Sequence, residues 1–67
     1  MTELAEKMIR YRALHNMSQG DLAEKCQVSR QTIYNLESDL QTPSKVTLMK
    51  ILIGIGESND AGKYLKY

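Results

Sequence analysis

Apolar residues recur along this chain at spacings of three and four, the periodicity of helices that bury one face. In the first such segment Leu4, Met8 and Tyr11 stand at i, i+4 and i+7. We therefore expect a helix over about residues 2–15, capped by Thr2. Asn16 follows as a helix-ending residue, because Asn tolerates the left-handed conformation.

Two short helical patterns follow back to back within residues 18–38. Ser18 is placed to cap the first, with Asp21 three residues on in the capping-box arrangement. Its buried face is marked by Leu22, Ala23 and Cys26. Ser29 is placed to cap the second, whose buried edge is marked by Ile33 and Leu36. The second pattern therefore presents Arg, Gln and Asn side chains outward, the types that make bidentate hydrogen bonds to guanine or adenine in the major groove.

This stretch resembles the helix-turn-helix of the lambda-repressor- and Cro-like family of DNA-binding proteins, also called the XRE family. The matching residues are Ser18-Gln19, Leu22-Ala23, Val28-Ser29-Arg30-Gln31-Thr32-Ile33, Leu36-Glu37 and Pro43-Ser44. The register holds over about 27 residues, and a looser match covers nearly the whole chain. The resemblance implies an all-α fold, a compact bundle of about five short helices around a central helix-turn-helix, in a single domain over residues 1–67.

The family register also implies an ion pair between Arg12 and Glu37, which would tie the first helix to the recognition helix. The alternative is that Arg12 is a solvated surface charge, as most arginines are. The chain departs from the family pattern twice. Gln27 replaces a glycine of positive φ, at a cost on the order of 1 kcal/mol. Ser38-Asp39 replaces Asn-Gly, so that an acidic group lies near the expected DNA backbone or the loop stands away from it.

Pro43-Ser44 open a fourth helix with two apolar stripes. The inward stripe of the family corresponds to Leu48, Ile51, Leu52 and Ile55. A second stripe consists of Val46, Met49 and Ile53. A helix that is apolar nearly all round is expected to be covered on both sides. Gly54 and Gly56 weaken its end, and residues 57–67 are expected to form a tail or short helix.

Composition narrows the function classes. One cysteine in 67 residues excludes an internal disulfide, and the length suits one small domain of modest stability. We find no membrane-spanning run and no signal peptide, so we expect a cytoplasmic protein, prokaryotic or phage-encoded and associated with the nucleoid when bound. The net charge of +1 is low for a nucleic-acid binder, which calls for segregated basic residues or a dimer.

No enzyme, cofactor, metal site or small-molecule ligand is expected. Cys26 falls on a buried face and is read as a small core residue. His15 has no second histidine beside it, which excludes a usual metal-ligand pattern. Paired carboxylates, a glycine-rich phosphate loop and a nucleophile–base pair are all absent from the sequence. Five lysines are read as solvated charges: Lys7, Lys25, Lys50, Lys63 and Lys66.

The expected partner is double-stranded DNA, with the second helical pattern in the major groove. The base-reading candidates are Arg30, Gln31 and Asn35, with Thr32 and Tyr34 as possible contacts to a thymine methyl or the backbone. The phosphate-binding candidates are Gln19, Ser29 and Lys45. Three alternatives remain open: Arg30 contacts phosphate rather than a base, Thr32 is a cap partner of Ser29, and Tyr34 covers apolar surface.

The family binds as twofold dimers, so we expect a homodimer on a palindromic operator. The dimer-interface candidates are Val46, Met49, Ile53, Tyr64, Leu65 and Tyr67. The alternative is that the tail covers this stripe within one subunit. Three functions are compatible with the chain: a small repressor- or Cro-like regulator, which we favour, an antitoxin or restriction-modification controller that regulates its own operon, and a protein-interaction module that has lost DNA binding.

Overall fold

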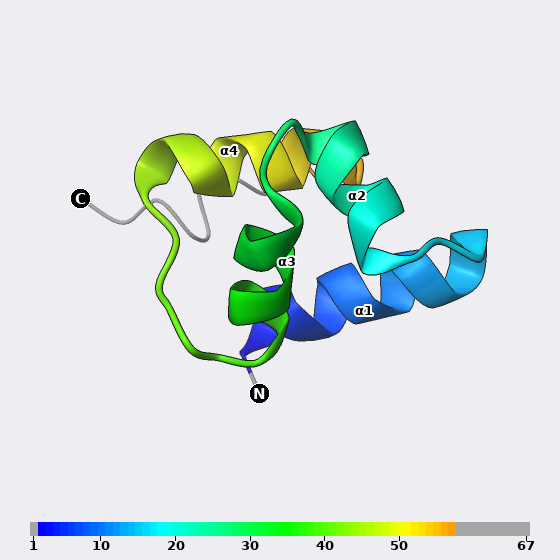
Figure 1. Ribbon diagram of the computed structural model, residues 1–67, viewed down its shortest axis with the longest axis horizontal. Coiled ribbons are helices and arrows are strands. Elements are labelled where there is room, and N and C mark those ends of the chain that lie inside the picture. Colours follow the sequence, from blue (N-terminus) through cyan, green and yellow to red (C-terminus); the bar gives the residue numbers. More distant parts are fainter. Residues whose placement is uncertain (1, 58–67) are drawn as a thin grey trace.

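The computed structural model describes residues 2–57 of the chain and is built from helices within that part (Figure 1). In chain order they are α1 (Glu3–His15), α2 (Gln19–Cys26), α3 (Arg30–Glu37) and α4 (Lys45–Gly54). The all-α fold class is confirmed. The fifth helix expected near the C-terminus lies outside the described residues, as do Lys63, Tyr64, Leu65, Lys66 and Tyr67.

Each of these four helices begins after a Ser or Thr whose hydroxyl oxygen accepts a hydrogen bond from the N–H three residues later. These pairs are Thr2–Ala5 at 3.0 Å, Ser18–Asp21 at 3.0 Å, Ser29–Thr32 at 3.1 Å and Ser44–Thr47 at 3.2 Å. At α2 the Asp21 carboxylate also accepts from the Ser18 N–H at 3.0 Å, which completes the expected capping box. Local sequence therefore sets where each helix starts.

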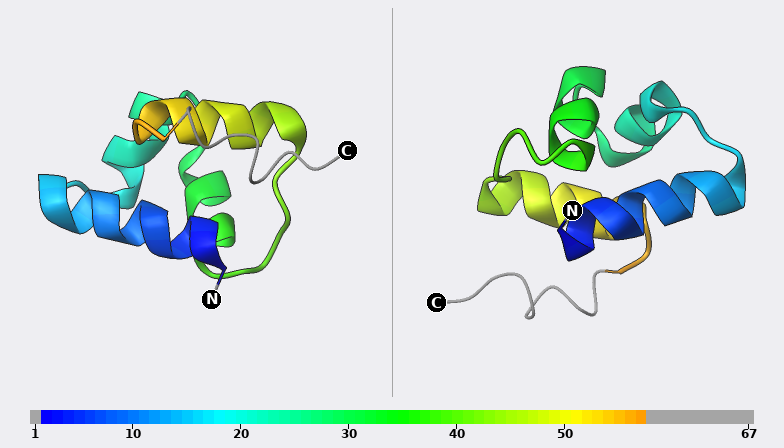
Figure 2. Two further views of the ribbon diagram at one scale, coloured as in Figure 1. Left: turned by 180° about the vertical axis from the view of Figure 1, so that it is seen from behind. Right: turned by 90° about the horizontal axis from the view of Figure 1, so that it is seen from below.

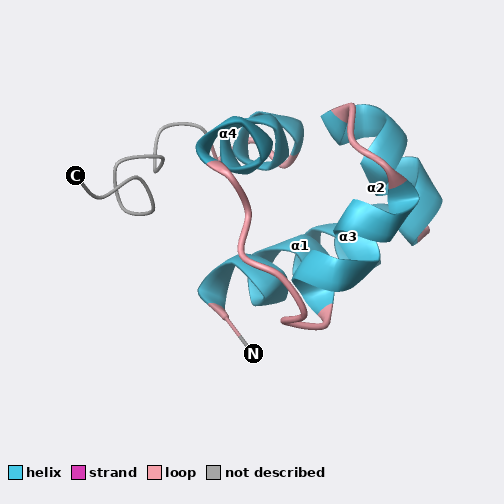
Figure 3. Cartoon of the chain, turned by 60° about the vertical axis from the view of Figure 1, so that its left-hand side comes forward, coloured by secondary structure: helices cyan, strands magenta, loops and turns pink. Residues whose placement is uncertain are grey.

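The core lies between two layers. Seen from below (Figure 2, right), α1 and α4 form one layer, and α2 and α3 lie over them. The helix α3 lies between α1 and α2 (Figure 3) and packs on both, while α4 packs on α2. The buried apolar residues come from all four helices and the residue after α4: Leu4, Met8, Leu22, Ala23, Cys26, Ile33, Leu36, Leu48, Ile51, Leu52 and Ile55. The helical periodicity and the family register predict all of these residues to face inward, together with Tyr11, which is only partly buried. Ala5 is also fully buried and was not predicted.

The turn between α2 and α3 takes the conformation expected from the family register. Gln27 ends α2 with φ of 59°, in the left-handed region, and its N–H donates to the Glu24 carbonyl. The Lys50 ammonium of α4 donates to the Gln27 carbonyl at 3.4 Å. The turn is thus held from α4 as well as from α2, although its left-handed residue is not a glycine.

Two expectations about individual residues need correction. Lys7 is not simply solvated, because its ammonium lies 2.7 Å from the Glu57 carboxylate and links α1 to the segment after α4. Gly54 does more than weaken the end of α4. It is buried against Cys26 of α2, where a larger residue would not fit. Both contacts join parts of the chain that sequence spacing alone does not bring together.

The second apolar stripe of α4 faces outward within the described part of the chain. Val46 is 67% exposed and Ile53 is 63% exposed, whereas Met49 is half-buried. Nothing among residues 2–57 covers Val46 or Ile53, so this stripe remains a candidate contact surface.

Candidate nucleic-acid interface

The helix α3 has a buried face and a polar outer face. Ile33 is fully buried, and Leu36 and Glu37 are nearly so. Arg30, Gln31 and Tyr34 are exposed, while Thr32 and Asn35 are half-buried at the boundary. Gln31 lies opposite the buried positions 33, 36 and 37 and Tyr34 lies to one side of them, whereas Arg30 is exposed as the first residue of the helix.

Four of the predicted DNA-contacting residues meet around one shallow hollow between α2 and α3. Its lining consists of Gln19, Arg30, Gln31 and Tyr34. A Cβ added to Gly20 would lie 3.9 Å from the Cδ of Arg30, which places the Arg30 side chain beside the first turn of α2. The first N–H groups of a helix have no partner within it and favour anions. A guanidinium and a helix N-terminus therefore border the same hollow.

Ser29 and Thr32 are engaged with each other. The Ser29 hydroxyl accepts from the Thr32 N–H, and the two hydroxyl oxygens lie 2.8 Å apart. This is the cap arrangement that was the alternative reading of Thr32. Both hydroxyls keep hydrogen-bonding capacity, because each oxygen has two lone pairs.

Three carboxamides form a chain along the outer face of α3. The Gln31 Nε2 donates to the Asn35 Oδ1 at 2.9 Å, and the Asn35 Nδ2 donates to the Gln41 Oε1 at 2.9 Å. Gln41 was not identified from the sequence, because it lies in the loop after α3 and outside any periodic pattern. Asn35 is thus already bonded on both its oxygen and its nitrogen.

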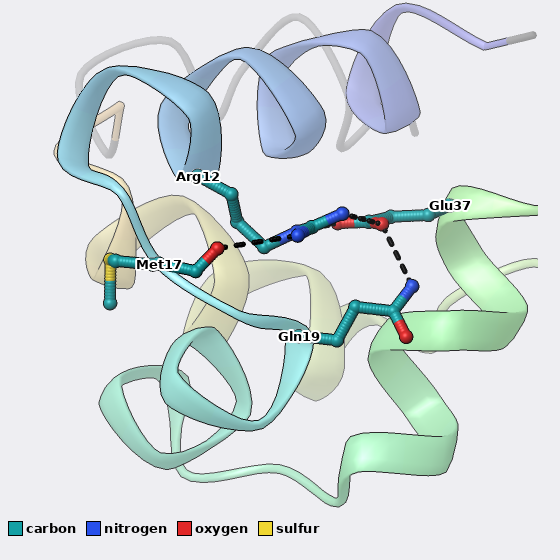
Figure 4. Close-up of polar contacts among 4 residues, drawn as sticks. All are labelled: Arg12, Met17, Gln19 and Glu37. Carbon is teal, nitrogen blue, oxygen red and sulfur yellow. Dashed lines mark hydrogen bonds and ion pairs between the residues drawn. The ribbon is translucent and has the colours of Figure 1, made fainter.

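The Glu37 carboxylate receives hydrogen bonds from side chains of two other helices (Figure 4). Arg12 of α1 donates from Nε to Oε2 at 2.8 Å and from Nη2 to Oε1 at 2.7 Å. Gln19 of α2 donates from Nε2 to Oε1 at 3.0 Å. Arg12 also donates to the Met17 carbonyl at 3.3 Å. The hydrogen bond with Glu37 raises the pKa of Arg12. These contacts fix the end of α3 to α1 and α2.

The hydrogen bond to Glu37 modifies the role expected for the Gln19 side chain. The sequence prediction assigned its side chain to a phosphate, whereas in the structure one amide N–H is directed inward to the carboxylate. The second N–H of the amide and the backbone N–H at the start of α2 remain the groups suited to a phosphate.

The two remaining charges of the expected interface lie near the ends of the loop between α3 and α4. Lys45 is the exposed first residue of α4. Asp39 has φ of 58°, and its Oδ1 accepts from the Thr2 N–H at 3.3 Å, at the start of α1. The acidic group that departs from the family pattern is thus bonded to the N-terminal end of α1, where a negative charge is favourable.

Between residues 2 and 57, no group of three or more His, Cys, Asp and Glu side chains is placed to hold a metal ion. In the same part of the chain, no helix has the length and apolar character needed to cross a membrane. Burial raises the pKa of the Cys26 thiol, in keeping with a core residue.

Comparison with known proteins adds to this geometry. The sequence model of a family described as helix-turn-helix matches residues 8–58. An uncharacterised HTH-type transcriptional regulator of Methanocaldococcus jannaschii is 48% identical over 48 residues, which cover 72% of this chain and 73% of that protein. No solved structure matches the chain significantly.

Proposed function

Because the chain belongs to the lambda-repressor- and Cro-like helix-turn-helix family of DNA-binding proteins, we propose that it is a small transcriptional regulator that binds a palindromic operator as a twofold dimer. The observation that carries this proposal is the polar outer face of α3, where Arg30, Gln31 and Tyr34 stand exposed beside the start of α2. A helix whose inner face is packed on the core and whose outer face is polar fits the major groove.

In the proposed complex the first turn of α2 lies on a phosphate and the first turns of α3 enter the groove. Gln19 contributes its backbone N–H and its second amide N–H to the phosphate. Gln31 presents a carboxamide, which pairs with adenine through one donor and one acceptor. Arg30 either pairs with guanine or joins the phosphate site at the start of α2, and its position near Gly20 supports the second role.

The remaining candidates keep secondary roles in this proposal. Ser29 and Lys45 contact phosphates, and Thr32 and Tyr34 contact a thymine methyl or the backbone. Asn35 borders the readers and is hydrogen-bonded to two neighbours on the same surface, Gln31 and Gln41.

A second copy of the chain is the proposed partner for the outer stripe of α4. Val46 and Ile53 are largely exposed, and Met49 lies between them on the same face. Burying apolar side chains of this size removes apolar surface from water, which favours association. A dimer also doubles the basic surface offered to DNA, which suits a chain of net charge +1. We place the protein in the cytoplasm of its host.

The experiment that tests this function is an unbiased selection of duplex DNA by the purified protein at near-physiological salt. The expected result is a palindromic motif with half-site centres about 10 base pairs apart. An enriched motif without twofold symmetry overturns the dimer. A folded protein that enriches no motif overturns sequence-specific DNA binding and favours the interaction-module alternative.

Two variants and a control locate the readers on the selected site. Gln31→Ala is expected to flatten the preference at one base position in each half-site, by about 1–3 kcal/mol. Arg30→Ala relaxes one base position if Arg30 reads guanine. If Arg30 contacts phosphate, the variant weakens all sequences equally and lowers the salt slope by about one. Arg10→Ala, which removes an exposed arginine of α1 outside the hollow, serves as the matched control and is expected to keep the motif.

A further inference from the structure

The carboxamides of Gln31, Asn35 and Gln41 form a chain in which both hydrogen bonds run the same way, from a nitrogen to the oxygen of the next residue. Gln31 gives an N–H to the oxygen of Asn35, and Asn35 gives an N–H to the oxygen of Gln41. Gln31 and Gln41 are exposed, and Asn35 between them is half-buried. A side-chain amide has one acceptor oxygen and one donor nitrogen, so each bond limits what the next residue can offer.

The direction determines which residue is equipped to read a base. Gln31 uses one N–H on Asn35 and keeps its oxygen and its other N–H, which is the donor and acceptor pair that adenine requires. Asn35 uses its oxygen toward Gln31 and an N–H toward Gln41, so its amide is already engaged at both ends. Of these two carboxamides, Gln31 keeps more of its capacity to pair with a base, and Asn35 supports it.

Gln41 is the acceptor at the end of this chain of hydrogen bonds. Because its oxygen accepts from Asn35, the nitrogen of Asn35 must face the loop and the oxygen must face Gln31. Gln31 must then turn its nitrogen toward Asn35. If the Asn35 amide were reversed, it would offer an N–H to Gln31, and the Gln31 amide would reverse too. The order of donor and acceptor at Gln31 therefore depends on a residue ten positions away in sequence.

The loop that carries Gln41 is held in place at several points. The Leu40 N–H donates to the backbone carbonyl of Asn35 at 2.8 Å, directly beside the side-chain chain. The Asp39 N–H donates to the Leu36 carbonyl at 3.3 Å, and the Asp39 carboxylate accepts from the Thr2 N–H. These bonds hold Asp39 and Leu40, the residues directly before Gln41, against the end of α3 and the start of α1, and a positioning role requires such support.

We propose that Gln41 is a specificity-determining positioning residue, which acts through Asn35 to fix the orientation of the Gln31 amide and thereby the base that Gln31 prefers. This inference rests on the proposed function, since it concerns how the same DNA-reading surface discriminates. Gln41 need not touch a base to exert this effect.

The test compares two substitutions of similar length at Gln41 in the full chain. Gln41→Met removes the acceptor for Asn35, and Gln41→Glu keeps an acceptor oxygen while adding a negative charge. For each variant, the affinity is measured for the best selected site and for the site changed at the base position that Gln31→Ala flattens. Gln41→Met is expected to reduce discrimination at that position by about threefold to tenfold. Gln41→Glu is expected to keep that discrimination while it weakens binding to all sites.

A double variant distinguishes positioning from direct contact. If Gln41 acts through Gln31, Gln41→Met has no further effect on that base position when Gln31 is already alanine. An effect of Gln41→Met that persists in the Gln31→Ala background, or that falls on another base position, overturns the inference and assigns Gln41 its own contact. Unchanged discrimination in Gln41→Met overturns it as well.

A measurement without DNA separates this inference from the proposed function. In the free protein, the side-chain amide of Gln31 is followed by NMR, and Gln41→Met is expected to shift its signals and lower its order parameter. Unchanged signals overturn the positioning role even where DNA binding is sequence-specific. Changed signals in a protein that selects no DNA motif leave the coupling in place but overturn the proposed function, and with it the role of Gln41 in specificity.

Discussion

Gly54 of α4 faces Cys26 of α2 so closely that a Cβ on Gly54 would lie 2.3 Å from the Cys26 Sγ. The same Cβ would lie 3.3 Å from both the Cα and the Cβ of Cys26. Atoms that are not bonded do not approach to the first of these distances, so α4 packs on α2 at this depth only because residue 54 has no side chain. Two small residues therefore set the spacing of the two helices.

We expect Gly54→Ala to lower the free energy of unfolding by about 1–3 kcal/mol, because the new methyl group overfills the core at Cys26. Urea unfolding measures the change. The matched control is Gly54→Ala combined with Cys26→Ala, which removes the Sγ and leaves the 3.3 Å contacts. The double variant is expected to be more stable than the sum of the single changes predicts, and strict additivity would contradict the close approach.

The Arg12–Glu37 pair yields a second stability prediction. Glu37→Ala is expected to lower the free energy of unfolding by about 3 kcal/mol, because it leaves Arg12 with a charge and several donors unmatched in a partly buried site. Thermal or urea unfolding measures this loss. Glu24→Ala removes an exposed glutamate of α2 and is expected to change stability by less than about 0.5 kcal/mol. If Arg12→Ala lowers stability as much in the Glu37→Ala background as in the wild type, the two residues are not coupled.

Replacing Gln27, the left-handed residue between α2 and α3, is expected to stabilise the protein. Gln27 has φ of 59°, where a residue with a side chain is less stable by roughly 1–2 kcal/mol than in the right-handed region. Gln27→Gly is expected to raise the free energy of unfolding by about 0.5–1 kcal/mol, since glycine's greater freedom in the unfolded chain offsets part of the relief. Gln27→Ala keeps a Cβ and is the control. An equal gain in both variants would show that the side chain, and not the backbone, is responsible.

The capping box of α2 predicts a dependence on pH. The Ser18 N–H and hydroxyl hold the pKa of Asp21 below its usual value of 3.8. Because the pKa is lower in the folded state, this contribution is complete above the unfolded pKa and is lost as the pH falls through the folded pKa. Asp21→Asn is therefore expected to make stability fall less steeply on acidification below about pH 4, as measured by urea unfolding at a series of pH values.

Ser18→Ala is the control for that prediction. It removes the hydroxyl but keeps the backbone N–H, which is the larger cause of the lowered pKa of Asp21. We expect this variant to be less stable than wild type by about 1 kcal/mol while most of the acid dependence at Asp21 persists. An acid dependence that disappears in Ser18→Ala would assign the effect to the hydroxyl instead.

The local elements of the fold were predictable because their signals are local. Ser and Thr caps, helical spacing of apolar residues and the family register together placed α1, α2, α3 and α4 and the buried stripe of each. The same register implied contact between Arg12 and Glu37, and in the structure the Arg12 Nη2 lies 2.7 Å from the Glu37 Oε1. The helix-turn-helix family is confirmed by the match over residues 8–58.

The features that were missed depend on distances between segments. Gln19 bonds to Glu37, Lys7 to Glu57 and Asn35 to Gln41, and the members of each pair belong to different elements. The spacing of apolar residues describes one helix at a time and does not show which other segments lie beside that helix. The place of Gly54 was missed for the same reason, because its need for space arises from α2.

The division of α3 into two faces separates folding from recognition. Ile33, Leu36 and Glu37 secure the helix from behind, while Arg30, Gln31 and Tyr34 contribute little to the core. Changes at these three outer positions are therefore expected to alter stability by only about 0.5 kcal/mol. The outer residues can therefore change during evolution and give a new target sequence while the protein stays folded. A designer can substitute the same positions without altering the core.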